Sequence, residues 1–260
     1  MSQKIAILPG MESLKISAFA DGYTGGKEGT GIWQKIINEI RPHDIFISGC
    51  LGNCAIARHK LPAKRNYGID IDPSVIDAWN EMKWEWITLI HGDVIAAVSQ
   101  LLAMEDLKEK RICLFLDPTY RMSSIKSDRP PYKFTMEDEW HHKFLSEVQK
   151  WSLHPNLDIL ITHYPDPLYK RKLKEWRRIP YLTKTRRGPV EEWLFMNYEH
   201  ESGELHDYRW IGDNKDERYN LKNRTAKNLI KKLNRMEVRK KQAIIYYMKE
   251  WLKNEVQSTA

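Results

Sequence analysis

The residues best suited to chemistry are Asp117-Pro118-Thr119-Tyr120, which directly follow the apolar run Ile112–Leu116. The Asp117 carboxylate and the Pro118 carbonyl are both hydrogen-bond acceptors, and the nearby ring of Tyr120 offers a surface for stacking. Two acceptors beside a flat ring suit an aromatic amine donor, such as the N6 amino group of adenine. This tetrapeptide is therefore the candidate catalytic motif.

Two glycine clusters have the composition of ligand-binding loops. Ser48, Gly49, Gly52 and Asn53 follow a second apolar run and let a ligand lie against the backbone. The segment Tyr23-Thr24-Gly25-Gly26-Lys27 places a lysine after a glycine pair, which suits an anion, although such a pair is more often a simple turn. Neither cluster fits the dinucleotide or phosphate-loop patterns.

Three carboxylates follow other apolar runs. Asp70 comes about twenty residues after the second glycine cluster, where a carboxylate accepts hydrogen bonds from ribose hydroxyls. Asp72 precedes Pro73 and is predicted to cap a helix. Asp93 either accepts a bond from an exocyclic amine or caps a helix, and the local sequence leaves both open.

The spacing of apolar residues predicts the elements that position these groups. Helical patterns at 73–82, 94–104 and 136–152 separate short apolar runs. Strands alternating with helices predict an α/β fold with a mixed, mostly parallel sheet, whose ligands bind at the carboxyl ends of the strands. The predicted strands are residues 44–49, 65–72, 86–93, 111–118, 157–164 and 190–198.

In this order the motifs resemble the Dam-like family of DNA adenine-N6 methyltransferases. The similar segments are Tyr23 to Lys27, Phe46 to Cys54, Gly68 to Asp72, Asp117 to Tyr120, Leu160 to Tyr169 and Glu191 to Tyr198. Order and spacing match over residues 20–198. The resemblance implies a Rossmann-like, S-adenosylmethionine-dependent methyltransferase domain at 1–198, followed by a basic helical C-terminal extension at 199–260.

The chain departs from the family pattern in three places. Thr119 stands where the family usually has a second proline, which predicts a loop of altered stiffness. Ile47-Ser48-Gly49-Cys50 lacks the acidic and phenylalanine residues usual in the cofactor loop. Residues 55–116 leave no space for the usual inserted target-recognition domain, so recognition is expected from segment 165–188 and from the basic C-terminal helices.

The resemblance also implies a role for each site residue. Tyr23, Gly25, Gly26 and Lys27 would close one wall of the S-adenosylmethionine pocket. Ser48, Gly49, Gly52 and Asn53 would line the methionine moiety, Asp70 the ribose and Asp93 the adenine amine. The target adenine would leave the duplex and donate from N6 to Asp117 and Pro118 while Tyr120 stacks on its ring. The loop 121–134 is expected either to fold over this base or to be a surface loop with no role.

These implications favour site-specific methylation of adenine N6 in double-stranded DNA. An RNA adenine-N6 methyltransferase is the first alternative, because the same motif serves either nucleic acid. The second is a catalytically weakened nucleic-acid-binding module of the same fold. No metal site is expected, since the three cysteines have no matching His or Cys pair.

The charge distribution supports a nucleic-acid partner. The chain carries a formal net charge of +7, with nine Lys/Arg against one acid in 170–187 and ten against one in 218–241. Both runs read either as solvated helix faces or as a polyanion groove. Helical spacing places Lys227, Lys231, Arg235 and Lys241 on one side of the second run, opposite an apolar stripe expected to dock on the core. No apolar run long enough for a membrane span or a signal peptide is present, so a cytoplasmic location is expected, nucleoid-associated if the substrate is DNA.

Overall fold

The computed structural model describes residues 27–28, 31–125, 133–185, 188–200 and 203–258. They form two compact units, one made of 1–33 and 43–198 and the other of 34–42 and 199–260. Residues 34–42 belong to the second unit in this division, and the catalytic domain at 1–198 with an extension at 199–260 stays a prediction. Tyr23, Gly25 and Gly26 of the predicted cofactor site, and residues 126–132 of the predicted loop, lie outside the described residues.

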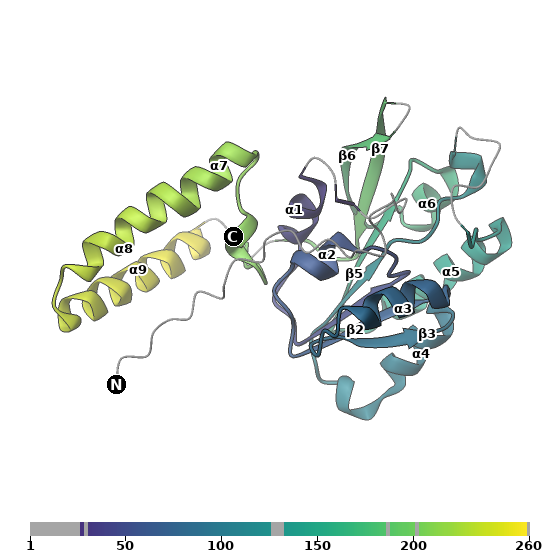
Figure 1. Ribbon diagram of the computed structural model, residues 1–260, viewed down its shortest axis with the longest axis horizontal. Helices are drawn as coiled ribbons and strands as arrows, with labels where there is room; N and C mark the ends of the chain where they lie inside the picture. Colours follow the sequence, from purple (N-terminus) through teal and green to yellow (C-terminus); the bar gives the residue numbers. More distant parts are fainter. Residues whose placement is uncertain (1–26, 29–30, 126–132, 186–187, 201–202, 259–260) are drawn as a thin grey trace. The chain divides into compact units, whose positions relative to one another are not determined.

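The first unit is built on a seven-stranded sheet in the order β3-β2-β1-β4-β5-β7-β6 (Figure 1). Neighbours among β1 to β5 run parallel, whereas β7 is antiparallel to both β5 and β6. This confirms the predicted mixed, mostly parallel sheet. The strands are β1 Ile45–Gly49, β2 Arg65–Asp70, β3 Thr88–His91, β4 Ile112–Leu116, β5 Leu157–His163, β6 Arg177–Thr185 and β7 Gly188–Met196.

Helices fill the connections between the strands, as the sequence pattern predicted. In the first half of the chain they are α1 Ile32–Ile37, α2 Ala55–His59, α3 Pro73–Glu81 and α4 Val94–Ala103. They continue with α5 Asp138–Trp151 and α6 Pro167–Lys172, and short 3₁₀ turns occur at Glu105–Leu107, Met122–Ser124 and Tyr208–Trp210. Asp72 accepts a hydrogen bond from the Ser74 amide and caps α3, as expected from its place before Pro73.

The core explains why the central strands are apolar throughout. Ile47, Leu114 and Ile159 point to one face of the sheet and are completely buried in a cluster that includes side chains of α4, α5 and α6. Phe46 and Phe115 alternate with them and are equally buried. A parallel sheet with both faces covered needs such runs, because neither face meets water.

The strand order also locates a crevice. The chain leaves β1 toward β2 but leaves β4 toward β5, on opposite sides of the β1–β4 pair. Connections that diverge in this way open a crevice at the carboxyl ends of the two strands, where ligands bind in open α/β sheets. Gly49 is in register with Leu116, so the glycine loop after β1 and the motif that begins at Asp117 lie at this edge.

The basic run 170–187 is not one helix face. It contains the end of α6 and then β6, an edge strand that the sequence did not predict. Nine residues of β6 pair with β7, and Pro180 is tolerated because an edge strand has one unpaired side. Periodicity missed the strand because its lysines and arginines hide the short apolar alternation.

The second unit ends in a helical arm, defined here as residues 215–258. It consists of α7 Lys215–Asn220, a π-helical segment Leu221–Ala226, α8 Lys227–Asn234 and α9 Val238–Ser258. Lys241 lies in α9, so the predicted stripe that joined it to Lys227 breaks where α8 ends. Leu229 and Ile230 are 42% and 53% exposed, and their docking on the core stays a prediction. None of the described helices is both long and apolar enough to cross a membrane.

Candidate active site

Asp117 stands at the centre of the polar groups at the sheet edge. It is the first residue after β4, and its side chain is 16% exposed. The Lys27 ammonium lies 2.8 Å from Oδ1, and the Thr162 hydroxyl at the end of β5 donates to the same oxygen at 2.6 Å. Both bonds fall on Oδ1, so Oδ2 accepts no hydrogen bond from the described residues.

Glu192 extends this cluster into a buried network. Lys27 Nζ lies 2.8 Å from Glu192 Oε1 and donates to the Tyr120 hydroxyl at 2.6 Å. The Tyr120 hydroxyl in turn donates to Glu192 Oε1 at 2.6 Å. Because β7 is antiparallel to β5, its amino-terminal half lies at the carboxyl edge of the parallel strands and brings Glu192 there.

The network places one lysine between two carboxylates in a dry environment. Burial opposes the charge on Lys27, but Asp117 and Glu192 together raise its pKa above the usual range, so it remains a cation. Burial and the charge of Glu192 raise the pKa of Asp117, whereas Lys27 and the hydrogen bond from Thr162 oppose this rise. Lys27 is therefore the group that favours an ionised Asp117 most, and Thr162 adds to its effect.

The ring of Tyr120 is already in an aromatic contact. It is 5% exposed, and its centroid lies 4.0 Å from that of Tyr164 at an interplanar angle of 31°. His163 meets it edge-on at 5.4 Å. A base that stacks on Tyr120, as the sequence suggested, must share this surface with Tyr164 or displace it.

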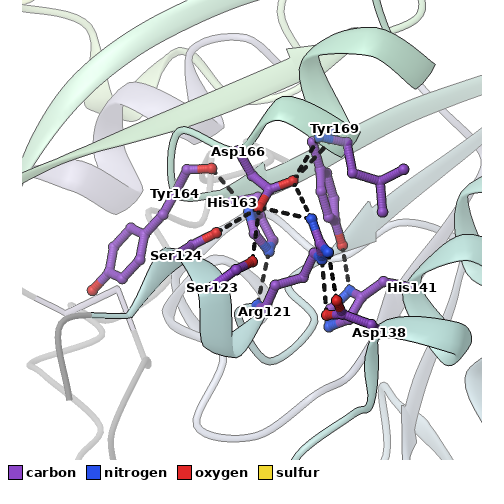
Figure 2. A network of polar contacts seen from close by, with 10 residues as sticks. Arg121, Ser123, Ser124, Asp138, His141, His163, Tyr164, Asp166 and Tyr169 are labelled. Atoms are coloured by element: carbon purple, nitrogen blue, oxygen red, sulfur yellow. Dashed lines mark hydrogen bonds and ion pairs between the residues drawn. The ribbon is translucent and has the colours of Figure 1, made fainter. Parts of the chain in front are cut away.

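Arg121 fixes the chain just after the motif, as Figure 2 shows. Its guanidinium donates to Asp166 at 2.9 and 3.0 Å and to Asp138 at 2.6 and 3.0 Å. Its backbone N–H donates to His163 Nε2 at 3.2 Å. Burial lowers the pKa of His163 to about 3, so the ring stays neutral and can accept this bond.

Thr119 has a contact that a proline does not offer. Its hydroxyl accepts a hydrogen bond of 3.1 Å from the Met136 N–H, just before α5. Residues 126–132 lie between these two positions in the chain. The departure from the family pattern thus gives the loop an extra attachment near its far end.

Lys27 and Glu28, the two described residues of this segment, both contact other parts of the unit. Lys27 has a φ of 56°, a left-handed conformation uncommon for a residue with a side chain. The next residue, Glu28, bonds to Arg58 and lies 3.1 Å from His59 Nε2 on α2. Burial opposes its charge, but the bonds from His59 and Arg58 hold the pKa of Glu28 below its ordinary value.

The glycine loop after β1 is hydrogen-bonded to the Asp70 side chain. Asp70 Oδ2 accepts from the Gly52 N–H at 2.8 Å, and Oδ1 accepts from the Asp72 N–H at 2.9 Å. Burial raises the pKa of Asp70 despite these bonds. Each oxygen can accept one more bond, so the carboxylate supports the loop and keeps capacity for a ligand hydroxyl.

The other predicted loop residues differ in their surroundings. A Cβ on Gly49 would lie 2.6 Å from Val94 and 2.7 Å from Leu116, so packing alone requires glycine there. Asn53 Oδ1 is buried and has no hydrogen-bond partner among the described residues. Ser48 is buried within β1, just before this loop. The orphaned amide oxygen is an acceptor suited to an amino group.

Asp93 has both oxygens engaged. Oδ1 caps α4 by accepting from the Ala96 N–H at 3.1 Å, and Oδ2 accepts from the Trp140 indole at 3.2 Å. The capping alternative is therefore present in the structure. A role toward an adenine amine remains a prediction and requires Asp93 to accept a third bond.

The structure joins five of the predicted site residues in two networks. Asp117, Tyr120 and Lys27 form one network, whereas Gly52 and Asp70 form another around the glycine loop. Thr162 and Glu192 join the first network and Tyr164 packs on its Tyr120 ring, although the resemblance included their segments without assigning them a role. Glu192 could have been found in part, because strand alternation places one of the two adjacent acids of β7 on the inner face, where a buried acid needs a partner of opposite charge.

No group of His, Cys, Asp or Glu in the described parts of the chain has the arrangement of a metal site. The chain matches no protein-family model and no curated protein. Among solved structures it is similar to an rRNA methylase from Streptococcus thermophilus, with 10% identity and a TM-score of 0.40 over 63% of this chain and 93% of that one.

Two other similar structures are a 23S rRNA methyltransferase, ErmE, and a magnesium protoporphyrin IX methyltransferase from Synechocystis with bound SAM. ErmE shares 13% identity and a TM-score of 0.38 over 63% of this chain and 65% of its own. The Synechocystis enzyme shares 10% identity and a TM-score of 0.38 over 63% of this chain and 74% of its own. Similarity at these identities and TM-scores carries no information about the chemistry of this chain. Its fold is described by its own strand order.

Proposed function

We propose that this protein is an S-adenosylmethionine-dependent methyltransferase that methylates adenine N6 in DNA. The ion pair between Lys27 and Asp117 carries this proposal. The two residues belong to separate motifs of the Dam-like resemblance, 90 positions apart, and they meet at the topological switch point of the sheet. A fortuitous match of short motifs gives no reason for the two to share a buried network.

The loop after β1 fits the cofactor that the resemblance implies. Its backbone adopts left-handed conformations at Cys50, with a φ of 57°, and at Gly52, with a φ of 43°. Asn53 Oδ1 offers an acceptor for the amino group, and Asp70 offers one for a ribose hydroxyl. When bound, S-adenosylmethionine supplies an electrophilic methyl group.

The residues of the motif would act on the target amine. Asp117 Oδ2 and the Pro118 carbonyl would accept its two N–H groups and orient the nitrogen lone pair toward the methyl group. Thr162 and Lys27 hold the other Asp117 oxygen, so the carboxylate is fixed before the substrate arrives. Positioning of this kind costs no reorganisation during the reaction, and it is the main source of rate in a direct transfer.

The substrate is tested by incubating the purified chain with methyl-labelled S-adenosylmethionine and either duplex DNA or structured RNA. Digestion to nucleosides then identifies the product. We expect N6-methyladenine in DNA. Label in RNA alone would favour the alternative of an RNA adenine-N6 methyltransferase. No label in either nucleic acid, with intact nucleic-acid binding, would favour the alternative of a binding module without catalytic activity.

Asp117→Ala is the matched control for catalysis. Lys27 keeps Glu192 as its partner in this variant, so the fold and the cofactor affinity should remain largely intact. Loss of an acceptor that acts in the transition state should cost at least ~3 kcal/mol, or about a hundredfold in rate. Near-normal turnover would remove Asp117 from the mechanism.

A further inference from the structure

The helical arm carries more positive charge than the whole chain. Residues 215–258 contain thirteen Lys/Arg and five Asp/Glu, an excess of eight, whereas the formal net charge of the protein is +7. The rest of the chain is thus slightly acidic. A concentration of cations in a separate element calls for a partner with many negative charges.

Four of these cations share one side of the arm. Arg224, Lys227, Lys231 and Arg235 are spaced by three, four and four residues along a helical segment that ends at the α8 cap. This spacing lines them up along about 16 Å of helix axis. The apolar side chains of the segment occupy the opposite side, namely Ala226, Leu229, Ile230 and Leu233.

The four cations, defined here as the cation stripe, have no ion pair with any described residue. Other cations of the arm do, since Lys240 pairs with Glu237 at 3.6 Å and Lys253 with Glu250 at 2.9 Å. All four stripe residues are exposed, and no residue from 215 to 255 is buried. No described acidic side chain therefore neutralises the charge of the stripe.

The other basic run of the chain, residues 170–187, is less suited to an extended anion. Arg178 stacks over the ring of Trp193, with 4.2 Å from its guanidinium carbon to the ring centroid. Arg177 donates to the Met196 sulfur. Some of its charge thus packs against the edge of the sheet, whereas the side chains of the cation stripe are exposed.

We propose that the cation stripe binds the phosphodiester backbone of duplex DNA and supplies affinity that does not depend on sequence. This inference rests on the proposed function for its choice of partner, because anionic lipid or RNA also carries phosphate. Each cation in the row replaces one counterion of the duplex, so binding weakens with salt in proportion to their number.

The test is the salt dependence of duplex binding by the full chain, measured without cofactor. Replacing all four stripe residues by glutamine should reduce the slope of log K against log salt by about three to four units. The matched control removes four exposed cations of the first unit, at Lys83, Lys110, Arg111 and Lys143, and should keep the wild-type slope. Equal slopes for the stripe variant and the wild type, or equal losses in the stripe and control variants, would overturn the proposal.

Two further probes separate the partner from the activity. Binding of the stripe variant is also measured with vesicles that contain phosphatidylserine and with duplex RNA. The choice of DNA is overturned if the variant loses affinity for either of these probes and keeps its affinity for DNA. The methyl-transfer assay is read independently. If the salt slope depends on the stripe but no methylation occurs, this inference stands and the proposed function is wrong. If methylation occurs but the slope is unchanged in the stripe variant, the proposed function stands and this inference is wrong.

Discussion

Lys27 and Lys231 carry the same ammonium group in opposite surroundings. Lys27 is 7% exposed and lies 2.8 Å from each of two carboxylates, whereas Lys231 is exposed on α8 and has no ion pair among the described residues. The first cation has its partners within the fold. The second leaves its charge available to a partner outside the chain.

The difference shows two ways in which charge serves function. At the sheet edge each group depends on one particular neighbour, so an isosteric change in one member disturbs the others. Along the arm the proposed phosphate contacts would depend on the number and spacing of the cations, so each cation would contribute about as much as the next. Substitutions should therefore have large and specific effects in the first region and small, additive effects in the second.

Lys27→Met should have the largest effect on stability. It leaves Asp117 and Glu192 buried without their shared cation, and breaking such a pair costs about 3–5 kcal/mol. Urea unfolding of the full chain measures the change. Lys249→Met, at an exposed position of the arm, is the control and should stay within about 0.5 kcal/mol of the wild type. A similar stability for the two variants would mean that the buried network is not formed.

Asp70→Ala should weaken S-adenosylmethionine binding by about tenfold to a hundredfold, because a hydrogen bond to a charged group is worth roughly 1.5–3 kcal/mol. Calorimetry measures the affinity. Asp70→Asn is the control for the loop, since its amide oxygen can still accept from the Gly52 N–H. If both variants bind the cofactor as the wild type does, Asp70 only supports the loop.

Glu192→Gln should change the pH dependence more than the maximal rate. Its charge raises the pKa of Asp117, so its removal should lower that pKa. Asp117 must be ionised to accept from the amine, and activity is lost as pH falls through its pKa. The acid limb of kcat should therefore move to lower pH. Glu191→Gln removes the same charge from the exposed side of β7 and should leave the limb in place. An unmoved limb in both variants would reduce Glu192 to a packing role.

Much of the fold was predictable because periodicity reports burial directly. The central strands are buried on both faces and read as continuous apolar runs, and Pro73 with Asp72 marks the start of α3. Edge strand β6 was not predictable in this way. β6 forms a strand because it pairs with β7, and no local sequence pattern describes that pairing.

The candidate site shows the same limit. Asp117 and Lys27 were found from local motifs, but their ion pair depends on a topology that joins segments 90 residues apart. Glu192 enters the site only because β7 runs antiparallel to β5. In the arm, Lys241 was grouped with Lys231 on the assumption of one continuous helix, whereas α8 ends at Asn234. Sequence spacing gives the faces of an element, but not where the element stops.

Lys231→Gln should have the smallest effect and should test the arm's side of the comparison most directly. Loss of one phosphate contact lowers the salt slope of duplex binding by roughly one unit, which between 50 and 200 mM salt amounts to about a three- to fourfold change in relative affinity. Lys227→Gln should give the same decrement, and the double variant should give twice as much, because the two cations meet separate phosphates. Lys249→Gln on α9 lies outside the cation stripe and serves as the control. A decrement of the same size at Lys249 would show that the whole arm responds to net charge, and a loss far larger than one unit at Lys231 would place that residue in a specific network like the one around Lys27.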